Sequence, residues 1–349
     1  MELTFRWFGN EDPIPLDYVR QIPGVRGVVS ALYDFPIGEP WPRDELAQLA
    51  ERIEAAGMRF AVVESIPVHE DIKLGRPSRD RLIDNYALSV RSMGEVGIPV
   101  LCYNFMPVFD WMRTDLDTRL PDGSTALSYD DDMLSRFDLS QGTGELPGWA
   151  KAYDPAALTG LLAAYSSMDV EHLWDNLAYF LERVVPVADS AGVRMAIHPD
   201  DPPWPIFGIP RIITNAAALD RVVGIVDSPA NGITFCTGSL GVDPLNDLPR
   251  MARDFAEMGR IHFAHCRNIR RTGNRKFVET PHPSEYGDVD MRAVLTALRD
   301  SGFSGPMRSD HGRRIWGERG RPGYGLYDRA LGATYLHGLW EGLSSRENT

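Results

Sequence analysis

Short runs of apolar and β-branched residues alternate along the chain with longer amphipathic stretches. Most of the short runs are continuously apolar, as expected for strands that are covered on both faces. Eight such runs predict β-strands. They span residues 4–9, 26–32, 59–65, 99–104, 194–199, 232–236, 260–268 and 305–310.

The amphipathic stretches between these runs predict α-helices. In residues 42–57, for example, Leu46, Leu49 and Ile53 share one face, and Gly57 ends the pattern. The other helical patterns span residues 78–97, 169–192, 214–226, 247–259, 290–302 and 326–343. This alternation predicts an α/β protein that forms a (β/α)8 TIM barrel, with residues 1–349 as a single domain. An open dinucleotide-binding sheet is disfavoured, because no G-x-G-x-x-G follows the first strand.

One connection breaks the alternation of strands and helices. Residues 105–169, after the fourth strand, are too many for an ordinary βα loop. The segment contains Phe109, Trp111, Tyr129 and Trp149, which argue against disorder. We therefore expect an inserted lid or an inter-subunit segment.

Composition narrows the class of protein. The chain is 43% hydrophobic, and its 36 basic and 49 acidic residues give a net charge of −13 without any basic run, so a nucleic-acid partner is not expected. The N-terminus lacks a signal-peptide pattern, and no window approaches the ~18 apolar residues of a membrane span. Only three cysteines are present, Cys102, Cys236 and Cys266, which argues against a disulfide framework. We expect a cytoplasmic protein with no membrane partner.

Four consecutive strands end in residue types that bind metals. His198, Cys236, His265 and Asp310 close the fifth to eighth strands. Neighbouring strands lie about 4.8 Å apart and share one carboxyl face, so these side chains can converge on a single ion. A thiolate, two imidazoles and a carboxylate admit Zn, Fe(II), Mn or Co. A closed structural zinc site is the alternative to a site that also accepts substrate.

Residues beside this set suggest acid/base chemistry. His311 follows Asp310 directly, and successive side chains on an extended segment diverge, so His311 is free to act as an acid or a base. Tyr324 stands between two glycines and is a second proton-transfer candidate. Arg267 and Asn268, just past the seventh strand, are candidate substrate-binding residues, with loop stabilisation as the alternative.

Long motifs resemble one family almost from end to end. AIHPDDPPWPIFGIPRI (196–212), ITFCTGSLGVDPLND (233–247) and the stretch SDHGRRIWGERGRPGYGLYDRALGATYLHGL (309–339) are similar to the mannonate dehydratases of hexuronate catabolism. The segments FRWFG (5–9) and IHFAHCRNI (261–269) extend the resemblance. One departure is Ser309, where the family pattern leads us to expect proline before the aspartate of the DHG motif.

The resemblance implies a xylose-isomerase-like barrel that dehydrates D-mannonate to 2-dehydro-3-deoxy-D-gluconate with Mn(II) or Fe(II). It matches His198, Cys236, His265 and Asp310 to the metal ligands. It also matches His311 and Tyr324 to the acid/base pair. Two other functions stay open at this point: a metal-dependent sugar isomerase or epimerase on the same barrel, and a non-catalytic barrel with structural zinc. The long insertion and acidic surface are compatible with a homodimer or homotetramer.

Overall fold

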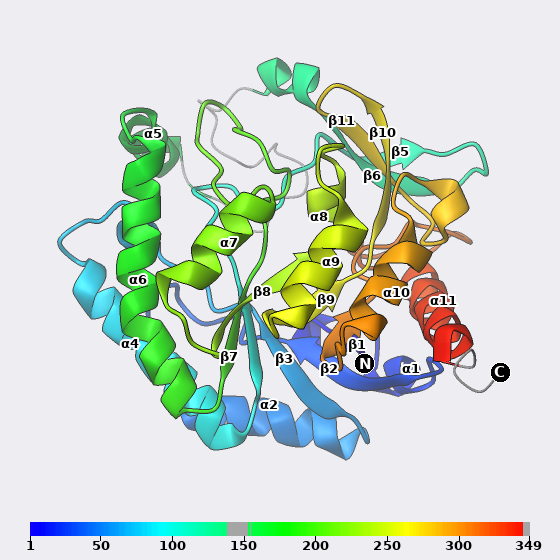
Figure 1. Cartoon of the computed structure of the whole chain (residues 1–349), viewed down its shortest axis with the longest axis horizontal. Coiled ribbons are helices and arrows are strands. Elements are labelled where there is room, and N and C mark those ends of the chain that lie inside the picture. Colours follow the sequence, from blue (N-terminus) through cyan, green and yellow to red (C-terminus); the bar gives the residue numbers. More distant parts are fainter. Residues whose placement is uncertain (138–152, 154, 345–349) are drawn as a thin grey trace.

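The computed structural model describes residues 1–137, 153 and 155–344. Eight parallel strands close into a barrel, in the order in which they follow one another along the chain (Figure 1). They are β1 (Glu2–Arg6), β2 (Val25–Ser30), β3 (Arg59–Glu64), β4 (Val100–Tyr103), β7 (Arg194–Ile197), β8 (Asn231–Cys236), β9 (Ile261–His265) and β12 (Pro306–Arg308). Each of the eight predicted strands is present, and the (β/α)8 TIM-barrel prediction is confirmed.

A helix follows each barrel strand and packs on the outside of the barrel (Figure 1). These are α1 (Leu16–Arg20), α2 (Arg43–Ala55), α4 (Arg79–Val96), α6 (Val170–Ser190), α7 (Ala216–Ile225), α9 (Leu248–Glu257), α10 (Met291–Asp300) and α11 (Tyr327–Ser344). Seven of them overlap the predicted helices. Side-chain N-caps begin several of them: Asn215, Asp247 and Asp290 accept from backbone N–H groups in the first turns of α7, α9 and α10. None of the described helices is both long and apolar enough to cross a bilayer.

The insertion after β4 contains secondary structure of its own. Its described part forms the hairpin β5 (Asp115–Arg119) and β6 (Thr125–Asp130), the turn η2 (Asp131–Arg136) and the helix α5 (Pro155–Ser166). Phe109 and Tyr129 are buried, as their aromatic character indicated. Trp149 lies outside the described residues.

A second hairpin after β9 completes a sheet that the sequence pattern did not predict. Strands β10 (Asn268–Gly273) and β11 (Lys276–Thr280) pair with the first hairpin in the antiparallel order β10-β11-β6-β5. The expected strand over 260–268 therefore ends at His265, and a new antiparallel strand begins at Asn268. The four strands lie together at one end of the barrel, where β4 and β9 emerge (Figure 1). The turn η4 (Ser284–Tyr286) follows β11 in the same connection, and the short elements η1 (Gly9–Glu11), α3 (Glu70–Lys73) and α8 (Thr237–Gly241) lie in other βα loops.

Candidate active site

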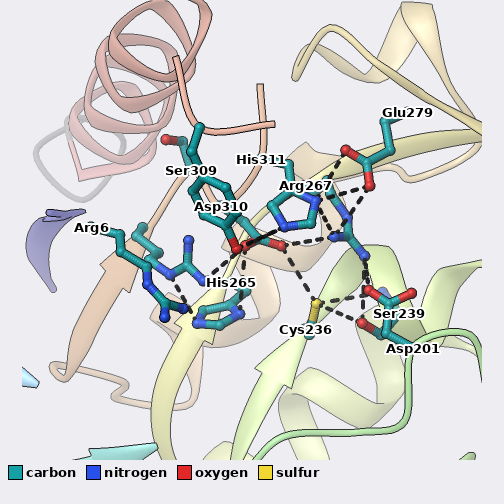
Figure 2. Close-up of polar contacts among 12 residues, drawn as sticks. Arg6, Asp201, Cys236, Ser239, His265, Arg267, Glu279, Ser309, Asp310 and His311 are labelled. Carbon is teal, nitrogen blue, oxygen red and sulfur yellow. Dashed lines mark hydrogen bonds and ion pairs between the residues drawn. The ribbon is translucent and has the colours of Figure 1, made fainter. Parts of the chain in front are cut away.

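The carboxyl ends of four neighbouring strands bring the predicted metal ligands together: ligand atoms of His198, Cys236 and His265 all lie within 4.8 Å of one another, and Asp310 lies beside them. Cys236 and His265 are paired in the register of β8 and β9, His198 directly follows β7, and Asp310 lies just past β12. His198 Nε2 and His265 Nδ1 are 3.1 Å apart. Carboxylate oxygens of Asp310 lie 3.9 Å from Cys236 Sγ and 3.9 Å from His265 Nδ1. Figure 2 shows Cys236, His265 and Asp310 turned toward one another.

The charges of these groups suit a cation. Burial alone would raise the pKa of the Cys236 thiol, but the positive charges of Arg267 and His198 outweigh it and hold that pKa well below its usual range. Burial alone would also raise the pKa of the Asp310 carboxyl. The positive charges of Arg308 and His311 outweigh that effect and hold this pKa well below its ordinary value. Burial would lower the pKa of His198, but the Cys236 thiolate raises it to about 9.

A thiolate and a carboxylate are thus buried between two imidazoles. Ser239 supports the thiolate, since its hydroxyl donates to Cys236 Sγ at 3.1 Å. Asp310 has a φ of 61°, in the left-handed region that non-glycine residues seldom adopt. Such strained residues persist where the surrounding structure holds them, and they cluster at functional sites. This donor set fits a borderline divalent ion, whose binding would displace protons from the ligands.

The predicted acid/base pair lies beside this cluster. His311 Nε2 is 3.0 Å from the Tyr324 hydroxyl, and both side chains are buried. On the other side of the ring, His311 Nδ1 is 2.9 Å from a carboxylate oxygen of Glu279. Trp111 of the insertion packs on the imidazole, with ring centroids 5.2 Å apart. A carboxylate, an imidazole and a phenol therefore form one hydrogen-bonded chain.

Glu279 belongs to a buried network of charges. Burial would raise its pKa, but His311 and Arg267 outweigh that effect and lower it to about 2, so the side chain is ionised. Arg113, which is fully buried, donates to Glu279 at 2.7 Å and to both carboxylate oxygens of Asp201 at 2.9 and 3.1 Å. Arg267 donates to Asp201 at 2.8 Å. Figure 2 shows Arg267 between Asp201, Glu279 and the ligand cluster.

The two predicted substrate-binding residues lie in different environments. Arg267 lines the cavity in front of the ligand cluster. Asn268 is absent from the residues that line that cavity. Its amide donates to the Pro283 carbonyl at 2.9 Å and accepts from the Ile269 and Val289 amides at 2.9 and 3.1 Å. These bonds give Asn268 the loop-stabilising role that the sequence left open.

The cavity has a volume of about 540 Å³, within the range of small-molecule sites. Polar and charged side chains line it together with aromatic and apolar ones. The charged and titratable residues that line it are Arg6, Tyr33, Glu64, Cys102, Tyr103, Asp110, His198, Asp201, Arg267, Arg308, Asp310, His311, Arg321 and Tyr324. The insertion contributes Asp110 and Trp111, so residues after β4 form part of the wall.

Comparisons with known proteins point to one family. The sequence model described as D-mannonate dehydratase (UxuA) matches residues 1–349, the whole chain. The chain belongs to the D-mannonate dehydratase family. The resemblance drawn from the motifs is thereby confirmed.

Relatives within the D-mannonate dehydratase family are similar over their whole lengths. Mannonate dehydratase 2 of Halalkalibacterium halodurans is 57% identical over 345 residues, which cover 99% of this chain and 100% of the relative. The mannonate dehydratase of Streptococcus uberis is 52% identical, with 98% of each chain covered. The crystal structure of mannonate dehydratase from Streptococcus suis serotype 2 superimposes with a TM-score of 0.93 at 48% identity, covering 99% of this chain and 96% of that one.

More distant structures share the barrel alone. The structure of L-ribulose 3-epimerase has a TM-score of 0.56 at 14% identity, with 99% of this chain and 96% of that chain covered. Similarity at this level shows a common fold alone. Membership of the D-mannonate dehydratase family therefore rests on the closer relatives.

A second group of possible ligands shares His265 with the first. Glu64, Cys102 and His265 also place ligand atoms within 4.8 Å of one another. Burial and the nearby Glu64 charge raise the pKa of the Cys102 thiol well above its usual range, so it stays protonated. Arg6 and Arg308 both donate to Glu64, at 2.6 and 2.9 Å, and their positive charges oppose a cation there. Glu64, Cys102 and His265 are therefore unsuited to hold a metal ion together.

Several residues of the site were missed by the sequence reasoning. Glu64 and Arg308 had a visible signal, because a charged residue inside a strand that is covered on both faces needs a buried partner. Asp201 also had a signal, because it lies shortly after His198 in the motif AIHPDDPPW, just past the end of β7. Arg113 and Glu279 carried no such signal, since Arg113 lies just before β5 and Glu279 lies in β11, and the pairing of the two hairpins is not visible in the sequence.

Three further residues, Ser309, His282 and His262, make contacts that support the structure. Ser309, the departure from the family pattern, donates from its hydroxyl to the Arg329 carbonyl at 3.0 Å. The ring of His282 is 2.7 Å from the Ser309 carbonyl and supports the segment before Asp310. His262 is buried against Met195, with its Nδ1 2.8 Å from that residue's carbonyl.

Proposed function

We propose that this protein converts D-mannonate to 2-dehydro-3-deoxy-D-gluconate and water, as a step of glucuronate catabolism. The observation that supports this most directly is that two groups of residues open into one cavity. His198 and Asp310 of the ligand cluster and the His311–Tyr324 pair line the same walls. A metal-binding cluster and a proton-transfer pair are what a dehydration next to a carboxylate requires.

We propose one divalent ion per chain, Mn²⁺ or Fe²⁺, held by His198, Cys236, His265 and Asp310. When bound, such an ion supplies Lewis-acid stabilisation of negative charge on a substrate oxygen. The identity of the ion follows from the family resemblance, and the donor set is compatible with it.

The hydrogen-bonded chain from Glu279 to Tyr324 suggests how protons move. Burial raises the pKa of Tyr324, so its phenol is neutral at rest. His311 Nδ1 lies 2.9 Å from the Glu279 carboxylate and 2.8 Å from Arg267 Nη1, which can only donate. We propose that during turnover Nδ1 carries a proton and donates it to Glu279 in place of accepting from Arg267, so that His311 Nε2 can accept the proton of the Tyr324 hydroxyl. This transfer gives a phenolate base and an imidazolium acid side by side.

Each of the two side chains then carries out one half of the reaction. The Tyr324 phenolate takes the proton from C2 of the substrate, and the His311 imidazolium gives its proton to the departing 3-hydroxyl, which leaves as water. The resulting enol tautomerises to the 2-keto acid, and both side chains return to their resting states. Each positioned transfer contributes on the order of 10²–10⁴ in rate. Glu279 stabilises the imidazolium through its negative charge.

Arg267 is proposed as a substrate contact, because it lines the cavity beside His311 and Asp310. For the insertion over residues 105–169 we propose a role in closing the site, supported by the packing of Trp111 on His311. A homodimer or homotetramer and a cytoplasmic location stay predictions. Sedimentation of the purified protein measures the number of subunits.

The test of this function combines product and metal analysis. Mn²⁺-loaded protein incubated with D-mannonate should form a 2-keto-3-deoxy acid, lose this activity with chelator and regain it with Mn²⁺. Turnover that persists in chelator would refute metal dependence. A rearranged sugar acid without loss of water would instead indicate an isomerase or epimerase, and an inert protein with tightly bound zinc would indicate a structural site.

Variants of His311 and Tyr324 test whether these residues transfer protons without binding the metal ion. His311→Ala and Tyr324→Phe should abolish turnover while retaining the ion, because neither side chain belongs to the donor set. Metal content measured on both purified variants checks this. Loss of the ion from either one would contradict the proposed division of roles.

A further inference from the structure

Glu64, at the end of β3, has one carboxylate oxygen with partners and one without. Its Oε1 accepts from Arg6 Nη1 at 2.6 Å and from Arg308 Nη2 at 2.9 Å. Its Oε2 is buried and has no hydrogen-bond partner among the described residues. An unpartnered buried carboxylate oxygen is costly, so its environment calls for a donor that this state of the site does not supply.

A candidate donor is the second nitrogen of a proposed metal ligand. His265 Nε2 lies 3.6 Å from Glu64 Oε2. In the structure this nitrogen accepts from Arg308 Nε at 3.0 Å. In a neutral imidazole only one nitrogen carries the proton, so this bond leaves the proton on Nδ1. Nδ1 is the atom that faces His198 and Asp310.

A ring nitrogen that carries a proton has no lone pair for an ion. Binding of an ion at His265 Nδ1 therefore requires the ring proton to be on Nε2, where it needs an acceptor. Glu64 Oε2 is free and within a short movement of the ring. Arg308 gives up only its Nε bond, since its Nη2 keeps Glu64 Oε1 at 2.9 Å and Asp310 at 2.9 Å.

We propose that Glu64 is the positioning residue for His265: in the metal-bound protein its Oε2 accepts the Nε2–H of His265 and so holds the Nδ1 lone pair toward the ion. This inference rests on the proposed metal site and adds the carboxylate behind it. Metal-binding histidines generally donate their other N–H to such an acceptor, and removal of the acceptor costs about 10–100-fold in metal affinity.

Glu64→Gln tests the inference sharply, because the two arginines fix the orientation of the new amide. The amide oxygen must stay with Arg6 and Arg308, which can only donate. The amide nitrogen then occupies the place of Oε2 and donates toward His265 Nε2. This arrangement favours the proton on Nδ1, the reverse of what an ion requires.

The measurement is the Kd for Mn²⁺ alone, from the paramagnetic resonance signal of free Mn²⁺ in titrations of the full-length protein. We expect Glu64→Gln to raise Kd about 10–100-fold. Arg6→Lys is the matched control, because it perturbs the same cluster, keeps its charge and leaves Oε2 untouched. Its Kd should stay within about threefold of that of the unmodified protein.

A second measurement needs no variant at Glu64. In unmodified protein loaded with diamagnetic Zn²⁺ and labelled with ¹⁵N-histidine, His265 should show a protonated Nε2 and a metal-shifted Nδ1. Equal Mn²⁺ affinity of the Glu64→Gln variant, or a Zn²⁺-bound His265 with its proton on Nδ1, would overturn the inference alone. Unmodified protein that binds no divalent ion would overturn the proposed metal site together with it. If Glu64→Gln does not fold, the nitrogen spectrum decides.

Discussion

Gly238, in the short helix α8 just past Cys236, offers a direct test of the buried charge network. A Cβ at this position would lie 2.0 Å from Arg267 Nε and 2.6 Å from Arg267 Cζ. Non-bonded heavy atoms pack at about 3.5 Å, so Gly238→Ala would force the guanidinium to move by roughly 1.5 Å. The side chain is buried and held at several points, so it cannot swing aside freely.

The cost follows from the bonds that such a movement breaks. Arg267 lies 2.8 Å from Asp201, 2.8 Å from His311 Nδ1 and 3.2 Å from Asp310. Breaking a buried ion pair costs about 3–5 kcal/mol. For 349 residues the unfolding entropy is roughly 0.7 kcal/mol/K. We therefore expect Tm to fall by about 4–7 °C, and kcat/KM for D-mannonate to fall because His311 loses a neighbour.

Gly224→Ala is the matched control for this prediction. Gly224 lies in α7, where an added Cβ meets no atom within 4 Å. Alanine is the better helix former, so this variant should gain about 0.5–1 kcal/mol. Thermal unfolding followed by circular dichroism at a fixed scan rate measures both variants. A Tm for Gly238→Ala within a degree of the unmodified protein would refute the reasoning.

Two further predictions concern other buried side chains. Glu279→Gln should lower kcat about 10²–10³-fold with KM changed less than about threefold, because Arg113 would hold the amide oxygen beside His311 Nδ1 and the neutral amide would no longer stabilise the imidazolium by its charge. Steady-state kinetics at constant metal content measure this, and an unchanged kcat would remove Glu279 from the proton chain. Burial lowers the pKa of His262 from 6.5 to about 4, so the folded state keeps it neutral, and its contribution to stability is complete above pH 6.5 and lost as the pH falls toward 4. Between pH 8 and pH 5 this amounts to about 2 kcal/mol of unfolding free energy. His262→Gln should show a correspondingly weaker loss of urea stability over that interval, whereas parallel pH profiles for the two proteins would contradict the assignment.

The barrel was predictable from the sequence because each strand carries its own signal. Runs such as residues 59–65 and 232–236 are apolar on both faces and are bounded by helical patterns, and neither feature depends on distant residues. The proposed ligands were accessible for the same reason. A residue at the end of a barrel strand has its place fixed by the fold, so His198, Cys236 and His265 were brought together by topology alone.

The supporting residues could not be placed in this way. Arg113 and Glu279 are 166 positions apart: Arg113 lies just before β5, Glu279 lies in β11, and the pairing of β6 with β11 brings the two hairpins together. The alternating pattern of a solvated hairpin is weak, and register between two hairpins has no local signature. Glu64 is a different case. It stands at the end of the third predicted strand, and the proposed pairing with His265 concerns a hydrogen bond that sequence reasoning does not reach.

The sheet β10-β11-β6-β5 takes two strands from each of two excursions out of the barrel. Neither hairpin has its partner without the other, and each excursion contributes one residue of the Arg113–Glu279 pair. An engineered barrel with this chemistry would therefore need both the segment after β4 and the segment after β9. A chimera with the segment after β4 alone would keep every strand-end donor but lack Glu279, and one with the β10–β11 hairpin alone would keep Glu279 but lose Arg113, which donates to it.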